Sequence, residues 1–247
     1  MQFVKDYRSS RHTIILMGPP KSGKSTLAVN LFGRENAIVI AYDREGMKSV
    51  GKVDQLLIDP SKVAQETIDA LAYIKSHCAN KKCIIVNDMT HAGRYYYAVA
   101  PASKDDRKMY QYAIQNLRSL VMKLNSEFPN QHIIYECVDM YIEDKEDKVV
   151  YNYPNVPGRT TFAQEFPGMV DHVFYVNLPR EKTTIINGKP IKSIERTILT
   201  ASDGLRLAGN RLNIAGESKV IDLSESVMIE DGSFANIEAL RKKILGE

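Results

Sequence analysis

Nine residues near the start of the chain combine the backbone and side chains that a phosphate site needs. They are Gly18-Pro19-Pro20-Lys21-Ser22-Gly23-Lys24-Ser25-Thr26, which match the pattern G-x-x-x-x-G-K-[ST] in full. Glycines let several backbone N–H groups converge on phosphate oxygens, and a helix N-terminus adds partial positive charge. We expect Lys24 to reach the β- and γ-phosphates of ATP and the Ser25 hydroxyl to bind Mg²⁺.

The segments on either side of this loop fit the same interpretation. Residues 13–17 are apolar and rich in β-branched side chains, as in a buried strand, and residues 27–31 read as the start of a helix. Strand, glycine loop and helix form the context that the pattern requires. The alternative, a chance glycine loop, does not explain why both flanks are correct.

Two further stretches place acids directly after apolar runs. Asp43 and Glu45 follow the predicted strand 37–42, and Asp88 follows the apolar residues 83–86. Ligands of α/β sheets bind beyond the carboxyl ends of the strands. We therefore predict that Asp88 holds Mg²⁺ opposite Ser25. The alternative for Asp43 and Glu45 is an ordinary turn, and chance runs ending in Asp are common.

Residues 91–108 mix basic and aromatic side chains, a texture that suits a surface for single-stranded nucleic acid. The candidate DNA-binding residues are Arg94, Tyr95, Lys104 and Arg107, with Arg159 further along the chain. The alternative is that tyrosines pack on the sheet and the charges are solvated. Acidic side chains at 143–147 argue against simple phosphate binding by the first half of the polar stretch 139–166, whereas Arg159 and the tyrosines of its second half remain candidates.

The bulk properties are those of a globular protein. The chain has 247 residues, 44% of them hydrophobic, and a net charge of +3, so any basic surface must be local. The three cysteines, an odd number at no metal-ligand spacing, favour buried thiols in a reducing compartment. No apolar run is long enough to cross a membrane, and we expect a cytoplasmic protein, in the host cytoplasm if it is encoded by a phage.

The remaining periodicities predict an α/β chain. Helices are expected from Ser61 to Cys78, at 105–127 and at 234–245. Strands are expected at 53–58, 132–138 and 171–178, and Asn187-Gly188 signals a late antiparallel hairpin that returns to Leu199. We divide the chain into a lead-in (1–12), a core (13–213) and a C-terminal extension with a helix (214–247).

The order of these signals resembles the RecA-like P-loop NTPases, and more closely the compact phage AAA-type proteins of single-strand annealing and recombination. The phosphate loop, the acids 43 and 45, Asp88 and a late loop with Asp203, Arg206 and Arg211 carry the resemblance. It implies a mostly parallel sheet flanked by helices, with a late antiparallel hairpin.

The resemblance also implies roles for particular residues. In RecA-like ATPases a glutamate at the position of Glu45 aligns the attacking water. Arg206 and Arg211 resemble basic fingers that enter a neighbouring subunit's nucleotide site, which implies a homo-oligomer, a ring or a filament. Glu136, near the end of the strand 132–138, is an unusual occupant of a position that commonly holds a polar sensor, and its role stays open.

The function expected from these residues is Mg²⁺-dependent ATP hydrolysis coupled to single-stranded DNA, in phage-type recombination or annealing. Two alternatives stay open. One is a P-loop kinase of small molecules, which would need an acceptor pocket and a lid. The other is an ATPase of the packaging or helicase-loader type.

Overall fold

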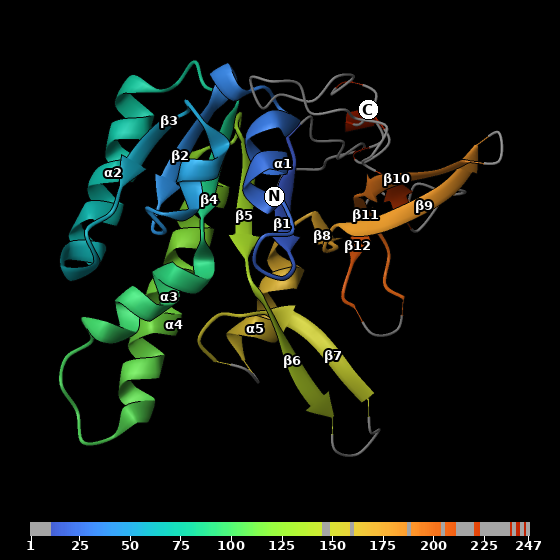
Figure 1. The fold of residues 1–247 in the computed structure, drawn as a ribbon. Helices are drawn as coiled ribbons and strands as arrows, with labels where there is room; N and C mark the ends of the chain where they lie inside the picture. Colours follow the sequence, from blue (N-terminus) through green and yellow to red (C-terminus); the bar gives the residue numbers. More distant parts are fainter. Residues whose placement is uncertain are drawn as a thin grey trace, which may run out of the picture.

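The computed structural model of the protein describes residues 11–144, 149–158, 161–186, 189–203, 206–210 and 220–222, together with Glu238, Arg241, Lys242 and Leu245. Within this part of the chain, helices cover both faces of a mostly parallel sheet, and two antiparallel hairpins project from it (Figure 1). The strands of the sheet are β1 (Thr13–Met17), β2 (Ala37–Ala41), β3 (Asp54–Leu57), β4 (Cys83–Asn87), β5 (His132–Cys137), β8 (His172–Val176), β11 (Thr197–Leu199), β12 (Gly209–Asn210) and β13 (Val220–Asp222).

The remaining elements connect or extend these strands. The helices are α1 (Lys24–Leu31), α2 (Val63–His77), α3 (Met89–Ala98), α4 (Asp106–Glu127) and α5 (Phe162–Glu165). Short 3₁₀ turns are η1 (Arg34–Asn36), η2 (Gly46–Val50), η3 (Pro60–Lys62) and η4 (Phe166–Met169). The hairpins are β6 (Asp139–Asp144) with β7 (Val149–Pro154), and β9 (Arg180–Ile186) with β10 (Lys189–Glu195).

The strand order is β13-β11-β8-β1-β5-β4-β2-β3, with β12 also paired to β8. The strands from β8 to β3 are parallel, whereas β11, β12 and β13 are antiparallel additions at one edge. The central strand β1, which leads into the phosphate loop, lies between β5 and β8. The carboxyl ends of these three strands therefore meet around the loop, where α/β sheets bind ligands.

Alternation along β1 shows why its sequence is continuously apolar. Ile15 and Met17 face the layer that contains α2, α3, α4 and α5, whereas Ile14 and Leu16 face the layer of α1 and η2. Every residue of β1 is buried. A parallel strand that is covered on both faces carries apolar side chains on both of them. Apolar and polar residues therefore do not alternate along β1.

The structure confirms the predicted α/β fold class, with its mostly parallel sheet, flanking helices and late hairpin. The helix predicted at 105–127 is α4, and the Asp105 side chain caps it by accepting from the N–H of Arg107. The helix predicted from Ser61 begins at Val63, because Asp59 caps the 3₁₀ turn that precedes it. Of the helix predicted at 234–245, the described residues Glu238, Arg241, Lys242 and Leu245 are helical.

Two segments differ from the sequence expectation. Residues 91–98, the first part of the stretch 91–108 that was interpreted as a basic and aromatic surface, belong to the helix α3, whose buried face includes Met89, Ala92 and Tyr96. The polar stretch 139–166 contains the hairpin β6–β7 and the short helix α5. Its strands mix apolar with charged and polar residues, and the hairpin projects from the sheet, as Figure 1 shows, with Met140 and Tyr153 at its base packed against the core.

Candidate functional site

The phosphate loop joins β1 to α1 and depends on two glycines. Gly18 has φ +150°, and a Cβ atom there would lie 2.4 Å from the carbonyl oxygen of Val176 at the end of β8. Gly23 has φ +99° and is the residue that precedes the first turn of α1. Both conformations favour glycine over residues with a side chain. The sequence pattern therefore reflects a backbone that must curl tightly against β8.

The lysine of this loop points back into the loop itself. The Lys24 Nζ donates hydrogen bonds to the carbonyl oxygens of Gly18 (2.8 Å) and Pro19 (2.9 Å). Lys24 is buried, and burial lowers the pKa of its ammonium group, against the opposing effect of the nearby carboxylates of Glu136 and Asp88. The positive charge is thus held inside the curl of the backbone, among acids at the ends of β4 and β5.

A three-residue cluster lies next to this lysine. The Ser25 hydroxyl donates to Glu136 Oε2 at 2.5 Å, and Asn87 Nδ2 donates to the same oxygen at 3.1 Å. Glu136 is 1% exposed, and burial raises its pKa to about 7 although Ser25, Lys24 and Asn87 favour the charged form. The carboxylate that meets the loop serine is therefore Glu136, whose role the sequence left open.

Asp88 follows Asn87 but has other partners. Its side chain caps α3 by accepting from the His91 N–H at 2.7 Å, and the same Oδ1 lies 2.8 Å from His91 Nδ1. This contact with Asp88 raises the pKa of His91 against the opposing effect of burial. Asp88 is buried and close enough to influence the pKa of Lys24. The predicted metal ligand is thus near the loop, and its Oδ1 serves the helix cap.

Glu45, the predicted water-aligning residue, lies outside this cluster. Its side chain is 77% exposed and forms an ion pair with Lys48 at 2.5 Å in η2. The acids that influence the pKa of Lys24 are Glu136, Asp88 and Asp139, and Glu45 is not one of them. The structure brings Lys24, Ser25 and Asp88 together, with Glu45 on the surface beyond β2.

The two predicted arginine fingers have different outcomes. Arg206 is held within its own chain: its side chain pairs with Asp203, donates to Asn177 and lies over the Tyr175 ring at 5.5 Å. Arg211 lies outside the described residues. A different arginine approaches the phosphate loop, since a Cβ atom on Gly23 would lie 3.8 Å from Nη1 of Arg196. No sequence pattern marked Arg196, because its approach depends on the junction of β10 and β11.

The predicted DNA-binding residues lie around α3 and the start of α4. Arg94, Lys104 and Arg107 are exposed, Tyr95 is partly buried, and Arg107 pairs with Asp105. Arg159 lies outside the described residues. A cavity of about 670 Å³ separates α3 and α4 from the base of the β6–β7 hairpin. Its lining includes Arg94 and the rings of Tyr97 and Tyr110, whose centroids are 4.7 Å apart.

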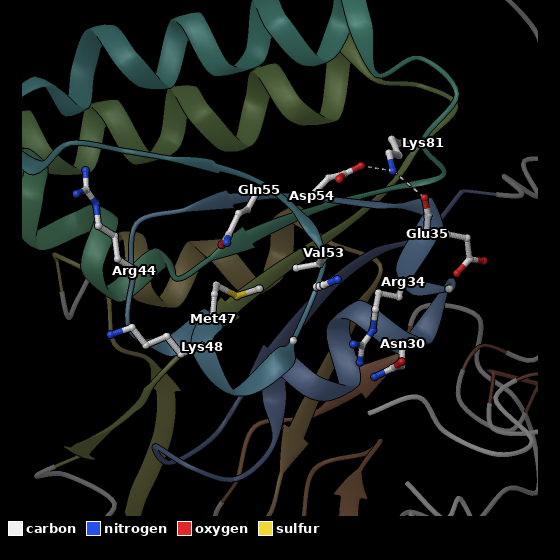
Figure 2. A pocket seen from close by; sticks show the side chains of 13 residues that line it. Asn30, Arg34, Glu35, Arg44, Met47, Lys48, Val53, Asp54, Gln55 and Lys81 are labelled. Atoms are coloured by element: carbon white, nitrogen blue, oxygen red, sulfur yellow. Dashed lines mark hydrogen bonds and ion pairs between the residues drawn. The ribbon is translucent and has the colours of Figure 1, made fainter. Parts of the chain in front are cut away.

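A larger hollow, of about 980 Å³, lies at the opposite end of α1, between that helix and the edge strand β3 (Figure 2). Its charged lining residues are Arg34, Glu35, Arg44, Lys48, Lys52, Asp54 and Lys81. Figure 2 shows Lys81 between Asp54, at 2.6 Å, and the carbonyl oxygen of Glu35, at 2.7 Å. Asn30, the residue of α1 that lines this hollow, lies six residues and so about 9 Å along the helix from Lys24.

Two further features bear on what the site can bind. Among the described residues, no three side chains of His, Cys, Asp or Glu gather closely enough to hold a metal ion by themselves. Mg²⁺ commonly takes one or two carboxylates together with substrate phosphates, and Ser25 and Glu136 fit that requirement.

In the part of the chain that the structure describes, none of the helices has the length and apolar character needed to span a bilayer.

Comparisons with known proteins identify the family of the chain. No curated protein matches the sequence. Among solved structures, the chain is similar to the crystal structure of the RadB recombinase, with 11% sequence identity, a TM-score of 0.42, and coverage of 79% of this chain and 90% of that chain. Residues 10–212 match the family AAA_24, described as an AAA domain. Because this match covers most of the chain, the protein belongs to the AAA_24 family and is a P-loop ATPase.

Proposed function

We propose that the protein hydrolyses ATP with Mg²⁺, and that single-stranded DNA stimulates this hydrolysis in phage-type recombination or annealing. The observation that carries the ATPase part is the cluster of Lys24, Ser25 and Glu136 around the curled loop. It supplies a buried cation for phosphate oxygens, and a hydroxyl and a carboxylate for a hard metal ion.

Each loop residue has a distinct part in this proposal. Lys24 would exchange its hydrogen bonds to the carbonyls of Gly18 and Pro19 for hydrogen bonds to the β- and γ-phosphates. The new bonds join a cation to an anion and are therefore stronger than those to neutral carbonyl oxygens. Ser25 would hold Mg²⁺ together with one carboxylate, a place that the sequence pattern assigned to Asp88. When bound, Mg²⁺ neutralises charge on the phosphate oxygens. Glu45 would align the attacking water after leaving its ion pair with Lys48.

The DNA part of the proposal is supported by the surface around α3. Arg94 and the neighbouring rings of Tyr97 and Tyr110 line one cavity, and Lys104 lies exposed between the two helices. Aromatic rings stack on bases of any sequence, and arginine adds both charge and a planar face. This cavity begins at Thr90, two residues after Asp88, so a bound strand would lie close to the nucleotide.

The proposed assembly is a homo-oligomer in which Arg211 contributes to a neighbouring nucleotide site. A cation supplied in trans is worth roughly 10³–10⁵ in rate in well-studied NTPases. Arg211→Ala should then remove the dependence of specific activity on protein concentration. Sedimentation with an ATP analogue and single-stranded DNA would measure the assembly directly.

The central experiment measures phosphate release with Mg²⁺ at increasing concentrations of single-stranded DNA. We expect turnover to rise with DNA and the stimulation to weaken with salt, because phosphate contacts release counterions. Arg94→Ala should reduce the stimulation while leaving turnover without DNA unchanged. Turnover that no DNA concentration alters would contradict the DNA part, and absence of ATP binding would contradict the proposal as a whole.

One observation favours a second candidate, a small-molecule kinase. The cavity of about 670 Å³ beside α3 lies within the size range of small-ligand sites and could serve as an acceptor pocket. Incubation with ATP and a panel of nucleosides and nucleotides, followed by a search for phosphorylated product, distinguishes the two. A phosphorylated acceptor would favour the kinase, whereas free phosphate alone would favour the ATPase.

A further inference from the structure

We propose that Glu136, and not Asp88, is the carboxylate that binds Mg²⁺ beside Ser25, and that Asn87 orients it. This inference rests on the proposed function, because it concerns the metal that accompanies ATP. It assigns to β5 a ligand that the sequence placed on the loop after β4. Four observations lead to it.

The first observation is the place of Glu136 in the sheet. Strand β5 lies between β1 and β4, and Glu136 is paired with Leu16 of β1. Neighbouring strands are about 4.8 Å apart, so a residue on β5 is one strand nearer to the phosphate-loop strand than a residue on β4. The direct contact between Ser25 and Glu136 follows from this adjacency.

The second observation is an unused carboxylate oxygen. Glu136 Oε2 accepts from both Ser25 and Asn87, but Oε1 is buried without a hydrogen-bond partner. A buried carboxylate oxygen without a partner is costly, and such an atom requires an explanation. A cation that binds next to Ser25 would supply one.

The third observation is that other oxygens in the same region also lack partners. Asn87 Oδ1 and Ser22 Oγ are buried and unpaired, the first at the end of β4 and the second inside the phosphate loop. Together with Ser25 Oγ and Glu136 Oε1, these are all hard oxygen atoms. That chemistry suits Mg²⁺ and not a soft metal.

The fourth observation is the occupation of Asp88. Its Oδ1 already accepts two hydrogen bonds from His91, one of which begins α3. Losing this cap would cost about fivefold in the equilibrium of helix formation. A structural role for Asp88 therefore explains its position, and Glu136 is left as the carboxylate that faces the loop serine.

The carboxylate and the carboxamide of this cluster come from two neighbouring strands, and the test can exchange them. The acid is on β5 and the amide is on β4, with Asn87 Nδ2 also 3.3 Å from Ser25 Oγ. If only the acid–amide pair matters, exchanging the two side chains should preserve the site. The double variant Asn87→Asp with Glu136→Gln makes this exchange and keeps one carboxylate and one carboxamide at the two positions.

The test compares the affinity of a fluorescent, non-hydrolysable ATP analogue in Mg²⁺ with its affinity in EDTA. The ratio of the two reports the metal contribution and needs no turnover. Loss of an outer-shell partner commonly costs 10–100-fold in metal affinity. We expect Glu136→Gln to reduce the ratio by roughly 100-fold and Asp88→Asn, the matched control, to leave it within about threefold. Affinity in EDTA should stay the same in both variants, which verifies that the loop is folded.

Binding of Mn²⁺, followed by its electron paramagnetic resonance signal with the same analogue, provides a second measurement. The exchange variant should recover most of the Mg²⁺ ratio and of the Mn²⁺ binding that Glu136→Gln loses. A full metal contribution in Glu136→Gln would overturn the inference, as would loss in Asp88→Asn alone. A wild-type protein whose nucleotide affinity does not change with Mg²⁺ would instead contradict the proposed function.

Discussion

The Nζ of Lys24 lies 2.8 Å from the carbonyl oxygen of Gly18, so the phosphate loop is closed around its own lysine. A triphosphate must displace this contact, and a second one to Pro19, before it occupies the loop. Lys24→Ala removes the cation, and we expect the affinity for MgATP to fall about 100-fold or more, since hydrogen bonds to charged groups contribute roughly 1.5–3 kcal/mol each. Calorimetric titration measures this loss, and wild-type affinity in the variant would contradict the role of Lys24.

Arg196 should matter for nucleotide binding more than Arg206. Arg196 approaches Gly23 in the phosphate loop, whereas Arg206 is engaged with Asp203 and Tyr175 of its own chain. We expect Arg196→Ala to weaken triphosphate binding about tenfold and to leave diphosphate binding less affected. Fluorescence titration with both nucleotides measures the difference, and equal affinities in the wild type and in Arg196→Ala would exclude a contact with the nucleotide.

Arg206→Ala should act on stability. Its loss removes a cation–π contact with Tyr175 of β8 and an ion pair with Asp203, and we expect a cost of about 1–2 kcal/mol. Thermal unfolding measures it. If Arg206 acts in trans instead, mixing the Arg206→Ala and Lys24→Ala proteins should restore turnover that neither has alone.

Sequence patterns predicted those parts of the fold that local chemistry decides. The apolar run of β1 and the stripe of α4 appear where expected, because burial on both faces or on one face leaves a direct trace in the sequence. The β6–β7 hairpin was missed, since its strands mix charged and polar residues with the apolar ones, and only its base, with Met140 and Tyr153, packs against the core. Ser25 and Lys24 were found from a pattern with fixed spacing.

The rest of the site could not be read from spacing. Glu136 and Ser25 are 111 positions apart, and only the strand order, with β5 beside β1, brings them together. One local signal was available: Asn87 and Glu136 are polar residues at the ends of two buried apolar strands. Arg196 left no signal, because its place depends on how the hairpin β9–β10 returns to the sheet.

Glu45→Gln tests the remaining sequence prediction about chemistry. If Glu45 aligns the attacking water, turnover should fall roughly 10²–10⁴-fold while MgATP binding is unchanged. Lys48→Met is the matched control, because it breaks the same exposed ion pair, worth at most about 1 kcal/mol, and keeps the acid. Single-turnover hydrolysis measures the effect. Unchanged turnover in Glu45→Gln would show that another residue positions the water.

A group of histidines at the opposite end of the sheet predicts sensitivity to acid. His12 Nδ1 and His172 Nε2 are 2.9 Å apart and buried, so their hydrogen bond requires a neutral acceptor nitrogen. His132 stacks on Phe32 and accepts from the His12 backbone N–H, and burial together with His12 lowers its pKa to about 3. Because this pKa lies below the usual 6.5, the unfolded chain binds the proton more tightly than the folded one.

The stability contributed by His132 is therefore complete above about pH 6.5 and decreases as the pH falls from there toward 3. We expect the urea midpoint to drop steadily over this range. His132→Phe should make the drop shallower, since an apolar ring keeps the stack on Phe32 and has no proton to bind. His77→Asn, which changes an exposed histidine of α2, is the control and should follow the wild type. If the urea midpoint of His132→Phe drops as steeply with falling pH as that of the wild type, the acid sensitivity belongs to other groups.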